Sequence, residues 1–283
     1  MARVTALSPI VGATIEGIDL NRLSDAQFLT IEDALHAHLV VTLPSQSVTP
    51  KRFVSFARRF GQPEPHVIDQ FHHRADPNIL ILSNRRNGAG EPIGLADGGT
   101  YFHCDYSYLA VPARCTMLFA IEIPGDDAGT TFANQRQAYG DLDAGIKARI
   151  DRLVCRHHYG NRDVADEDQR TAASKLTAEQ KNKVTWVRHP LVRAHPHVGA
   201  RSLYAVSGSS YGIEGMDDES GVELLDALKA HSTNSRYCYT PNYRAGDVVI
   251  WDNCSLLHSA PVIDSNRSRT LWRITVKEAG PTL

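Results

Sequence analysis

The sequence predicts a mainly β fold with flanking helices, of the jelly-roll (double-stranded β-helix) type. From about residue 79 onward, seven short segments rich in β-branched and aromatic residues are separated by Gly, Pro, Asp and Asn, a pattern typical of β-sandwiches and barrels. Helical periodicity precedes these segments and interrupts them at about 135–153, 177–184 and 216–231. No internal repeat divides the chain. The length fits one large domain or two small ones.

The N-terminal part is expected to supply two covering helices. After a short strand region, Ser24 can cap a helix that runs to Leu39, and a strand VVTLP (40–44) follows. The dipeptide Thr49-Pro50 predicts the start of a second helix, which ends at Gly61. The seven later strands are NILILS (78–83), TYFHCDYSYL (100–109), CTMLFAIEIP (115–124), GTTFAN (129–134), RSLYAVS (201–207), GDVVIWDN (246–253) and RTLWRITVKE (269–278).

One polar and strongly charged stretch, at about 161–183, contains few large apolar residues. It is a candidate lid or insertion, and a plain surface excursion is the alternative interpretation.

Composition excludes several classes of function. The chain has 283 residues, 42% of them apolar, and a net charge of −2, without the concentrated basic footprint of a nucleic-acid-binding protein. No segment approaches the roughly 20 apolar residues of a membrane span, and the N-terminus lacks a secretory signal pattern. Five cysteines at irregular spacing predict neither a disulfide framework nor a structural zinc site. We expect a cytoplasmic protein that binds neither nucleic acid nor membranes.

The segment GGTYFHCDYSYL (98–109) carries a histidine and an aspartate one residue apart. Strand residues two apart project to the same face, so His103 and Asp105 would point one way and Cys104 the other. The aromatic residues around them favour a strand. Taken alone, one His-x-Asp pair in a chain with thirteen histidines is a weak signal. Two surface side chains are the alternative.

A second segment, GDVVIWDNCSLLHSAPVIDSNRSRTLWRITV (246–276), holds an isolated histidine followed by a strand with two arginines on one face. Two histidines and one carboxylate make the facial triad of non-haem Fe(II), so the predicted catalytic metal ligands are His103, Asp105 and His258. Buried arginines require anions. Because a guanidinium pairs with a carboxylate through two hydrogen bonds, Arg269 or Arg273 could hold the far end of 2-oxoglutarate. A core histidine with two surface arginines is the alternative.

Taken in order, these segments closely resemble the Fe(II)/2-oxoglutarate dioxygenase family that includes taurine dioxygenase and 2,4-dichlorophenoxyacetate dioxygenase. The resemblance covers nearly the whole chain and implies a single domain over residues 1–283. Besides the paired arginines, it is carried by GATIEGIDL (12–20), FARRFGQPEPH (56–66), FHCDYSY (102–108), GTTFANQRQAYGDL (129–142), HPLVRAHPHVGARSLY (189–204) and WDNCSLLHSA (251–260).

By position, the resemblance implies that the triad binds iron and that Thr130 and Arg269 bind the distal carboxylate of 2-oxoglutarate. It implies that Arg273 faces the anionic group of the prime substrate, and His66 is a further candidate for substrate contact. Two departures leave that substrate unassigned. The segment ADGGTYF (96–102) lacks the asparagine of taurine dioxygenase-like sequences, and EPHVIDQFHHR (64–74) lacks the lysine of the phenoxyacetate enzyme.

The resemblance implies an oxidoreductase that uses Fe(II), 2-oxoglutarate and O2 to hydroxylate a small anionic molecule, a carboxylate or sulfonate, and releases succinate and CO2. It further implies a homo-oligomer, either a dimer or a tetramer. Two alternatives keep the same fold. One is a zinc hydrolase on the same triad, and the other is a catalytically silent jelly-roll binding protein.

Overall fold

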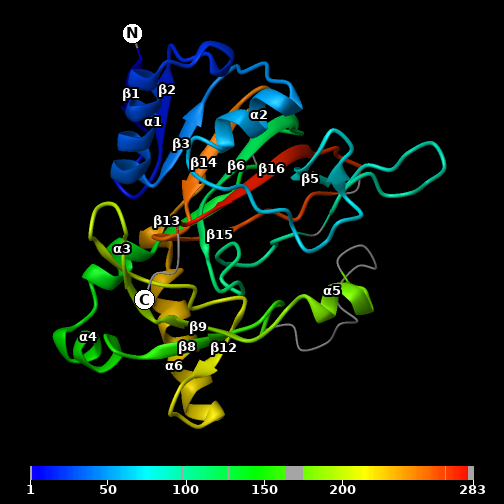
Figure 1. The fold of residues 1–283 in the computed structure, drawn as a ribbon. Helices are drawn as coiled ribbons and strands as arrows, with labels where there is room; N and C mark the ends of the chain where they lie inside the picture. The colour runs from blue at the N-terminus through cyan, green and yellow to red at the C-terminus, as the bar shows by residue number, and fades with distance from the viewer. Residues whose placement is uncertain (1, 97, 126–127, 163–174, 265, 280–283) are drawn as a thin grey trace.

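The structure, a computed structural model, describes residues 2–96, 98–125, 128–162, 175–264 and 266–279. Its largest part is an eight-stranded sheet that joins strands far apart in the sequence (Figure 1). Across the sheet the order is β1 (Arg3–Ala6), β2 (Ala13–Glu16), β3 (Val40–Leu43), β14 (Val248–Asp252), β6 (Ala113–Glu122), β16 (Thr270–Lys277), β5 (Asp76–Ser83) and β4 (His72–His73). The pair β2–β3 is parallel, whereas β14, β6 and β16 pair antiparallel.

A smaller sheet packs against the inner face of the large one. Its order is β13 (Cys238–Tyr239), β7 (Thr131–Asn134) and β15 (Leu256–Ser259). Phe132 and Leu256 of this layer share an apolar cluster with Leu118, Trp251 and Leu271 of the large sheet. The two layers form the predicted jelly roll.

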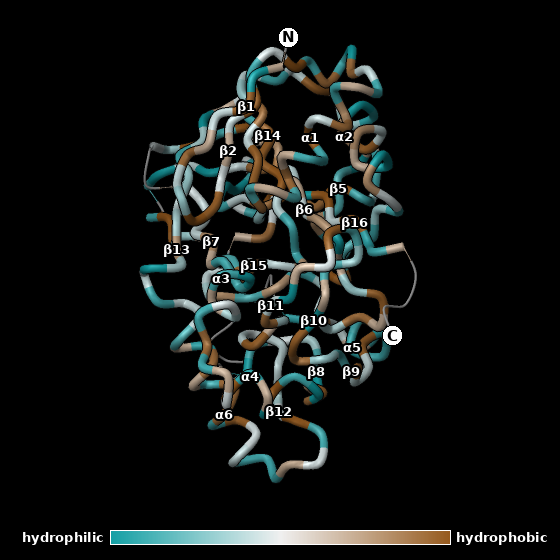
Figure 2. Tube along the Cα trace, turned by 90° about the vertical axis from the view of Figure 1, so that its left-hand side faces the viewer, coloured by the Kyte–Doolittle hydropathy of each residue, from teal (hydrophilic) through white to brown (hydrophobic). Residues whose placement is uncertain are grey.

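Two helices cover the outer face of the large sheet. Helix α1 (Asp25–His38) begins at Ser24, which forms a capping box with Gln27, and ends at Leu39 in a left-handed conformation. Helix α2 (Pro50–Ala57) begins after Thr49, as predicted, but ends earlier than Gly61. The apolar faces of both helices pack on strand residues that include Ile250 and Ile274. Figure 2 shows hydrophobic residues concentrated around β14, beneath these two helices.

A third region closes the far end of the molecule. It contains the sheet β12 (Ser210–Ile213), β8 (Val154–His157) and β9 (Val187–Pro190), and the hairpin β10 (Val192–Ala194) and β11 (Arg201–Leu203). Its helices are α3 (Gln135–Gly140), α4 (Ala144–Ile150), α5 (Ala178–Asn182) and α6 (Asp218–Ser232). Residues of α3, α4, α6 and these strands form a separate apolar cluster.

Two predicted elements were wrong. The strand predicted over 100–109 is absent, because His103 makes an isolated bridge and Tyr106 has a left-handed φ of 54°, which a continuous strand does not contain. The single helix predicted over 135–153 is two helices, α3 and α4, and Asn134 and Asp143 are their N-caps. Of the stretch proposed as a lid, residues 163–174 lie outside the described part of the chain, and α5 occupies part of the remainder.

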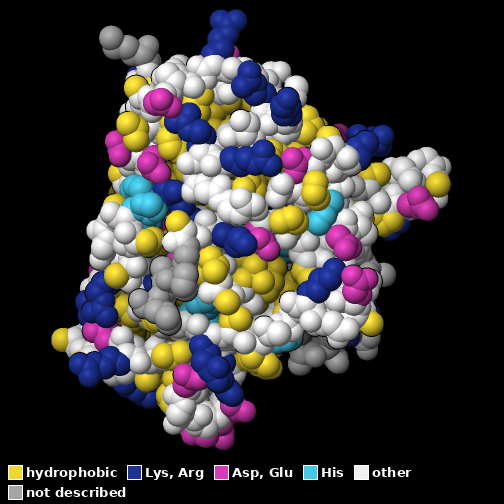
Figure 3. Space-filling view, in the orientation of Figure 1, with side chains coloured by type: hydrophobic (Ala, Val, Ile, Leu, Met, Phe, Trp, Pro, Cys, Tyr) yellow, Lys and Arg dark blue, Asp and Glu magenta, His cyan; other side chains and the backbone are white. Residues whose placement is uncertain are grey.

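The surface shows no concentration of one charge on the face seen in Figure 3, where Lys and Arg are interspersed with Asp and Glu. Among the described residues, no helix combines the length and apolar character needed to cross a bilayer. All five cysteines are free thiols in the structure.

Candidate active site

Backbone pairing brings two distant histidines side by side. His103 N donates to His258 O, and His258 N donates to His103 O, both at 2.9 Å. This bridge joins the loop that follows residue 98 to β15. The centroids of the two imidazole rings are 4.2 Å apart.

Asp105 completes the cluster. Its Oδ1 lies 3.8 Å from His103 Nε2, and its Oδ2 lies 3.5 Å from His258 Nε2. One donor atom from each of the three residues lies within 4.8 Å of the other two. Although the strand is absent, the chain places the three predicted side chains together, because the backbone bridge to His258 holds His103 beside β15, and Asp105 follows two residues later.

The protonation states of this cluster suit a divalent metal. Burial and the neighbouring His103 lower the pKa of His258 to about 3, and burial lowers the pKa of His103. For Asp105, burial opposes ionisation, but Arg273 and the two imidazoles hold its pKa below the usual range. His103 Nδ1 lies 2.8 Å from Tyr101 O, so its N–H donates to that carbonyl and Nε2 presents a lone pair. Neutral imidazoles with an ionised carboxylate are the donor set of a non-haem Fe(II) site.

A chain of buried side chains fixes the carboxylate of Asp105. Thr116 Oγ1 donates to Asp105 Oδ2 at 2.7 Å. Since that hydroxyl has one hydrogen, it accepts from Asn253 Nδ2 at 2.9 Å and from Thr275 Oγ1 at 3.1 Å. Thr116 was not among the residues predicted from the sequence, although a polar residue within the apolar run of β6 was a possible signal.

The metal-facing edge of His103 is kept open by a glycine. Gly99 has a left-handed φ of 78°, and a β-carbon built there would lie 3.0 Å from His103 Nε2. A side chain at position 99 would therefore cover the nitrogen that faces Asp105.

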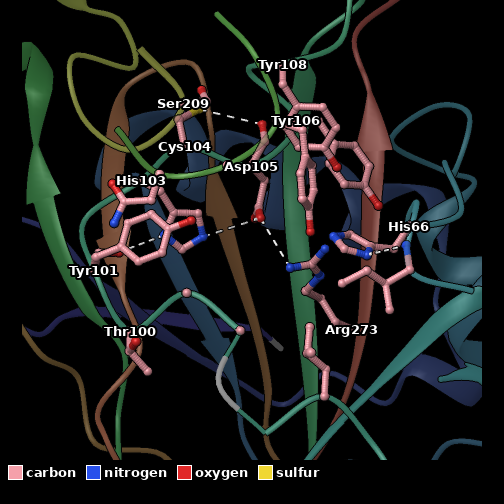
Figure 4. Close-up of a pocket in the computed structure, with 17 residues that line it drawn as sticks. His66, Thr100, Tyr101, His103, Cys104, Asp105, Tyr106, Tyr108, Ser209 and Arg273 are labelled. Carbon is pink, nitrogen blue, oxygen red and sulfur yellow. Dashed lines mark hydrogen bonds and ion pairs between the residues drawn. The ribbon is translucent and has the colours of Figure 1, made fainter. Parts of the chain in front are cut away.

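A cavity of about 320 Å³ opens beside the cluster and contains several predicted site residues. Figure 4 shows His103 and Asp105 on one side, Arg273 pointing at Asp105, and His66 beyond the arginine. Neither Thr130 nor Arg269 lines this cavity. The predicted residues thus fall into two groups.

One wall of the cavity is aromatic. Tyr108 packs edge-on against Tyr106, with centroids 5.8 Å apart, and against Tyr159 at 4.9 Å. His66 lies 5.9 Å from the ring of Tyr106, and its Nδ1 accepts from Ile68 N. Burial lowers the pKa of His66 well below its usual value, so it lines the cavity as a neutral ring.

Among the described residues, Arg273 is the one arginine in the lining of this cavity. It comes from β16, its Nη1 lies 3.4 Å from Asp105 Oδ1, and its guanidinium carbon lies 5.8 Å from the centroid of the Tyr106 ring. Its buried Nη2 makes no hydrogen bond within the described part of the chain. Asp105 therefore neutralises part of the charge of Arg273, and the Nη2 group of Arg273 is available to bind an anion.

The second group is joined by Tyr243, a residue that was not predicted from the sequence. Tyr243 OH accepts from Arg269 Nη2 at 2.9 Å and lies 3.0 Å from Thr130 Oγ1. All three side chains are buried. Tyr243 lies between β13 and β14, in a segment without strand or helix periodicity to mark it as inward-facing.

His195, Asp252 and Cys254 form a second buried cluster of possible ligands. His195 Nδ1 accepts from the backbone N–H groups of His197 and Val198, which leaves its proton on Nε2. That nitrogen faces Asp252 Oδ2 at 3.1 Å. A protonated Nε2 cannot bind a metal, so this cluster is a histidine–carboxylate pair that supports β14.

Comparison with known proteins agrees with this geometry. The family model described as "Taurine catabolism dioxygenase TauD, TfdA family" matches residues 3–275. An (S)-phenoxypropionate/alpha-ketoglutarate-dioxygenase from Sphingobium herbicidovorans is 28% identical over 271 residues, which is 95% of this chain and 92% of that protein. An alpha-ketoglutarate-dependent 2,4-dichlorophenoxyacetate dioxygenase from Cupriavidus pinatubonensis is 28% identical over 282 residues, 95% of each chain.

Among solved structures, the fold is similar to that of AAD-2 in complex with Mn(II) and N-oxalylglycine. The TM-score is 0.81 at 26% sequence identity, and the match covers 100% of both chains.

Proposed function

This chain belongs to the taurine catabolism dioxygenase TauD, TfdA family and is an Fe(II)- and 2-oxoglutarate-dependent dioxygenase, and from this premise we propose that it hydroxylates a small organic anion held by Arg273. The observation that carries the proposal is that His103 and Asp105 of the metal cluster line one cavity together with Arg273 and an aromatic wall.

We assign iron to His103, Asp105 and His258. Both imidazoles are neutral, the carboxylate is ionised, and Thr116 fixes one of its oxygens. Three protein ligands leave positions open for 2-oxoglutarate and dioxygen. Thr130 and Arg269 are the proposed partners of the distal carboxylate of 2-oxoglutarate.

The prime substrate is proposed to be a carboxylate or sulfonate with a ring-sized apolar body. Arg273 Nη2 supplies a charged donor for the anion, and Tyr106, Tyr108 and Tyr159 offer ring surface for the body. Two similar proteins are named for phenoxypropionate and 2,4-dichlorophenoxyacetate, acids of this shape. Aryl-substituted acids are therefore the first compounds to test.

In the proposed mechanism, the chain positions reactants rather than reacting itself. Iron held by His103, Asp105 and His258 would, with 2-oxoglutarate and dioxygen, supply the oxidising chemistry that releases succinate and CO2. Arg273 binds the anionic end of the substrate, and its contact with Asp105 keeps that end close to the metal ligands. The tyrosine wall orients the substrate body and excludes water from the site.

The proposal is tested by incubating the protein with Fe(II), 2-oxoglutarate and a panel of carboxylates, sulfonates, sulfate esters and their neutral analogues. Succinate release above the uncoupled background is expected with an acid from the panel and is expected to vanish in His258→Ala. Stimulation by neutral compounds alone would reject the role of Arg273. Failure to form any succinate from 2-oxoglutarate would reject the assignment of the site.

A further inference from the structure

We propose that Tyr243 is a third binding residue for the terminal carboxylate of 2-oxoglutarate and that it makes the site selective for a dicarboxylic 2-oxo acid. The inference rests on the proposed function, which assigns this carboxylate to Thr130 and Arg269. It adds a residue from a different segment, between β13 and β14.

The hydroxyl of Tyr243 joins the two assigned groups. Arg269 Nη2 donates to it at 2.9 Å, and Thr130 Oγ1 lies 3.0 Å away. A guanidinium only donates, so the phenol oxygen accepts from Arg269 while its own hydrogen is directed to Thr130 or to an arriving anion. A terminal carboxylate at this point would meet one charged donor and two hydroxyl donors.

Arg269 needs such an anion. The residue is buried, with 9% of its surface exposed. Among the described residues, its side-chain hydrogen-bond partners are both neutral, the carbonyl of Ala128 at 3.2 Å from Nε and the hydroxyl of Tyr243. A buried guanidinium without a carboxylate is costly. The arrangement is therefore one that a bound anion completes.

The position of Tyr243 is fixed by the strands on either side of the site. A β-carbon built at Gly129 would lie 2.6 Å from Pro241 O. Because Gly129 has no side chain, the chain before β7 can lie close to the segment that leads from β13 to Tyr243. Thr131 and Thr240 are hydrogen-bonded through their hydroxyls at 2.7 Å, and β13 pairs with β7. Tyr243 thus needs little rearrangement to bind, which preserves affinity.

The geometry has a consequence for selectivity. A carboxylate can accept from all three donors, whereas 2-oxovalerate, which has the same chain length but ends in a methyl group, can accept from none. Sites built around buried donors reject analogues that leave those donors unpaired. Removing one donor should weaken binding of the dicarboxylate and leave binding of the monocarboxylate little changed.

The test is calorimetric titration of the Mn(II)-loaded full-length protein with 2-oxoglutarate and, separately, with 2-oxovalerate. Tyr243→Phe removes one hydroxyl and keeps the ring. The Kd for 2-oxoglutarate is expected to rise about tenfold or more, as for loss of a hydrogen bond to a charged group, while the Kd for 2-oxovalerate stays within about twofold of the wild-type value. Tyr239→Phe, in the same apolar surroundings, is the matched control and should leave both values unchanged.

Three results would overturn the inference. These are an unchanged Kd for 2-oxoglutarate in Tyr243→Phe, an equal loss of affinity for both ligands, which a merely structural role would cause, and equal wild-type affinities for the two ligands. A wild-type protein that binds neither ligand would instead contradict the proposed function. The melting temperature of each variant, measured without ligand, shows whether the fold is retained.

Discussion

The hydroxyl of Thr116 donates to Asp105 at 2.7 Å and holds the carboxylate between two imidazoles. We predict that Thr116→Val, which keeps the shape and removes the hydroxyl, weakens metal binding about 10- to 100-fold, as loss of such supporting hydrogen bonds does elsewhere. Titration of the metal-free protein with Mn(II) measures this effect directly and does not depend on turnover.

A matched control is available in the same sheet. Thr42 in β3 is buried, and its hydroxyl has no hydrogen-bond partner within the described part of the chain. Thr42→Val should leave the affinity for Mn(II) unchanged. If both variants lose metal to the same extent, the effect belongs to the sheet and not to the bond with Asp105.

The three proposed iron ligands should be individually essential. His103→Ala, Asp105→Ala and His258→Ala are each expected to abolish turnover while the circular dichroism spectrum stays that of the wild type, because the apolar clusters that hold the fold together do not depend on metal. The measurements are succinate release and bound iron per chain. Near-normal activity in any one variant would remove that residue from the triad.

Arg269 should act on the co-substrate. Arg269→Ala is expected to raise the KM for 2-oxoglutarate far more than that for the prime substrate, since it removes a charge-assisted interaction worth ~1.5–3 kcal/mol. Steady-state kinetics with each reactant varied in turn separate the two effects. A proportional rise in both KM values would indicate that Arg269 stabilises the fold and does not bind 2-oxoglutarate specifically.

Arg273 should act on the prime substrate. We expect the wild-type protein to prefer an acid over its methyl ester or amide. Arg273→Gln is expected to lose most of that preference, because the guanidinium that binds the negative charge has been removed. The ratio of kcat/KM for the acid and its neutral analogue is the relevant quantity. A ratio that survives the substitution would show that another group recognises the anion.

The buried His157 predicts a dependence of stability on pH. Burial, with the charges of His189 and Arg193, lowers the pKa of His157 well below 6.5. The unfolded chain therefore binds a proton at this residue before the folded one does, and stability is lost as the pH falls below 6.5. The expected loss from one such group is about 1.4 kcal/mol per pH unit.

Urea unfolding of the metal-free protein between pH 7 and pH 5 measures this slope. His157→Gln should be less stable at pH 7 and should lose less stability on acidification than the wild type. Parallel pH profiles for the two proteins would exclude His157 as a source of the slope.

The residues of the metal cluster could be predicted from the sequence, whereas the backbone conformation that positions them could not. The types and order of His103, Asp105 and His258 predicted a cluster that the structure brings together, although no strand exists at His103. The aromatic residues of 100–109 have high strand propensity, but propensity does not register a left-handed residue such as Tyr106. The bridge to His258, a tertiary contact, replaces the strand.

Supporting residues were harder to predict, for a physical reason. Thr116 is β-branched and ordinary within a strand, so a polar residue in the apolar run of β6 is a weak signal, and the contact with Asp105 is what identifies it. Tyr243 lies outside regular structure, where no periodicity says which way a side chain points. Arg269 and Arg273 shared a predicted face, yet of these two only Arg273 lines the cavity beside His103 and Asp105.

Gly99 lines the cavity but cannot be replaced without disturbing the proposed metal site, whereas other residues of the lining can be varied. A library aimed at new substrates can diversify Tyr108, Tyr159 and Ser209, which line the cavity and belong to neither proposed ligand group. Position 99 lines the same cavity, but any β-carbon there would crowd His103 Nε2. Variants with a side chain at position 99 are expected to fold but to bind no iron. In a screen for new substrates, their lack of activity would be mistaken for a failure to bind the substrate.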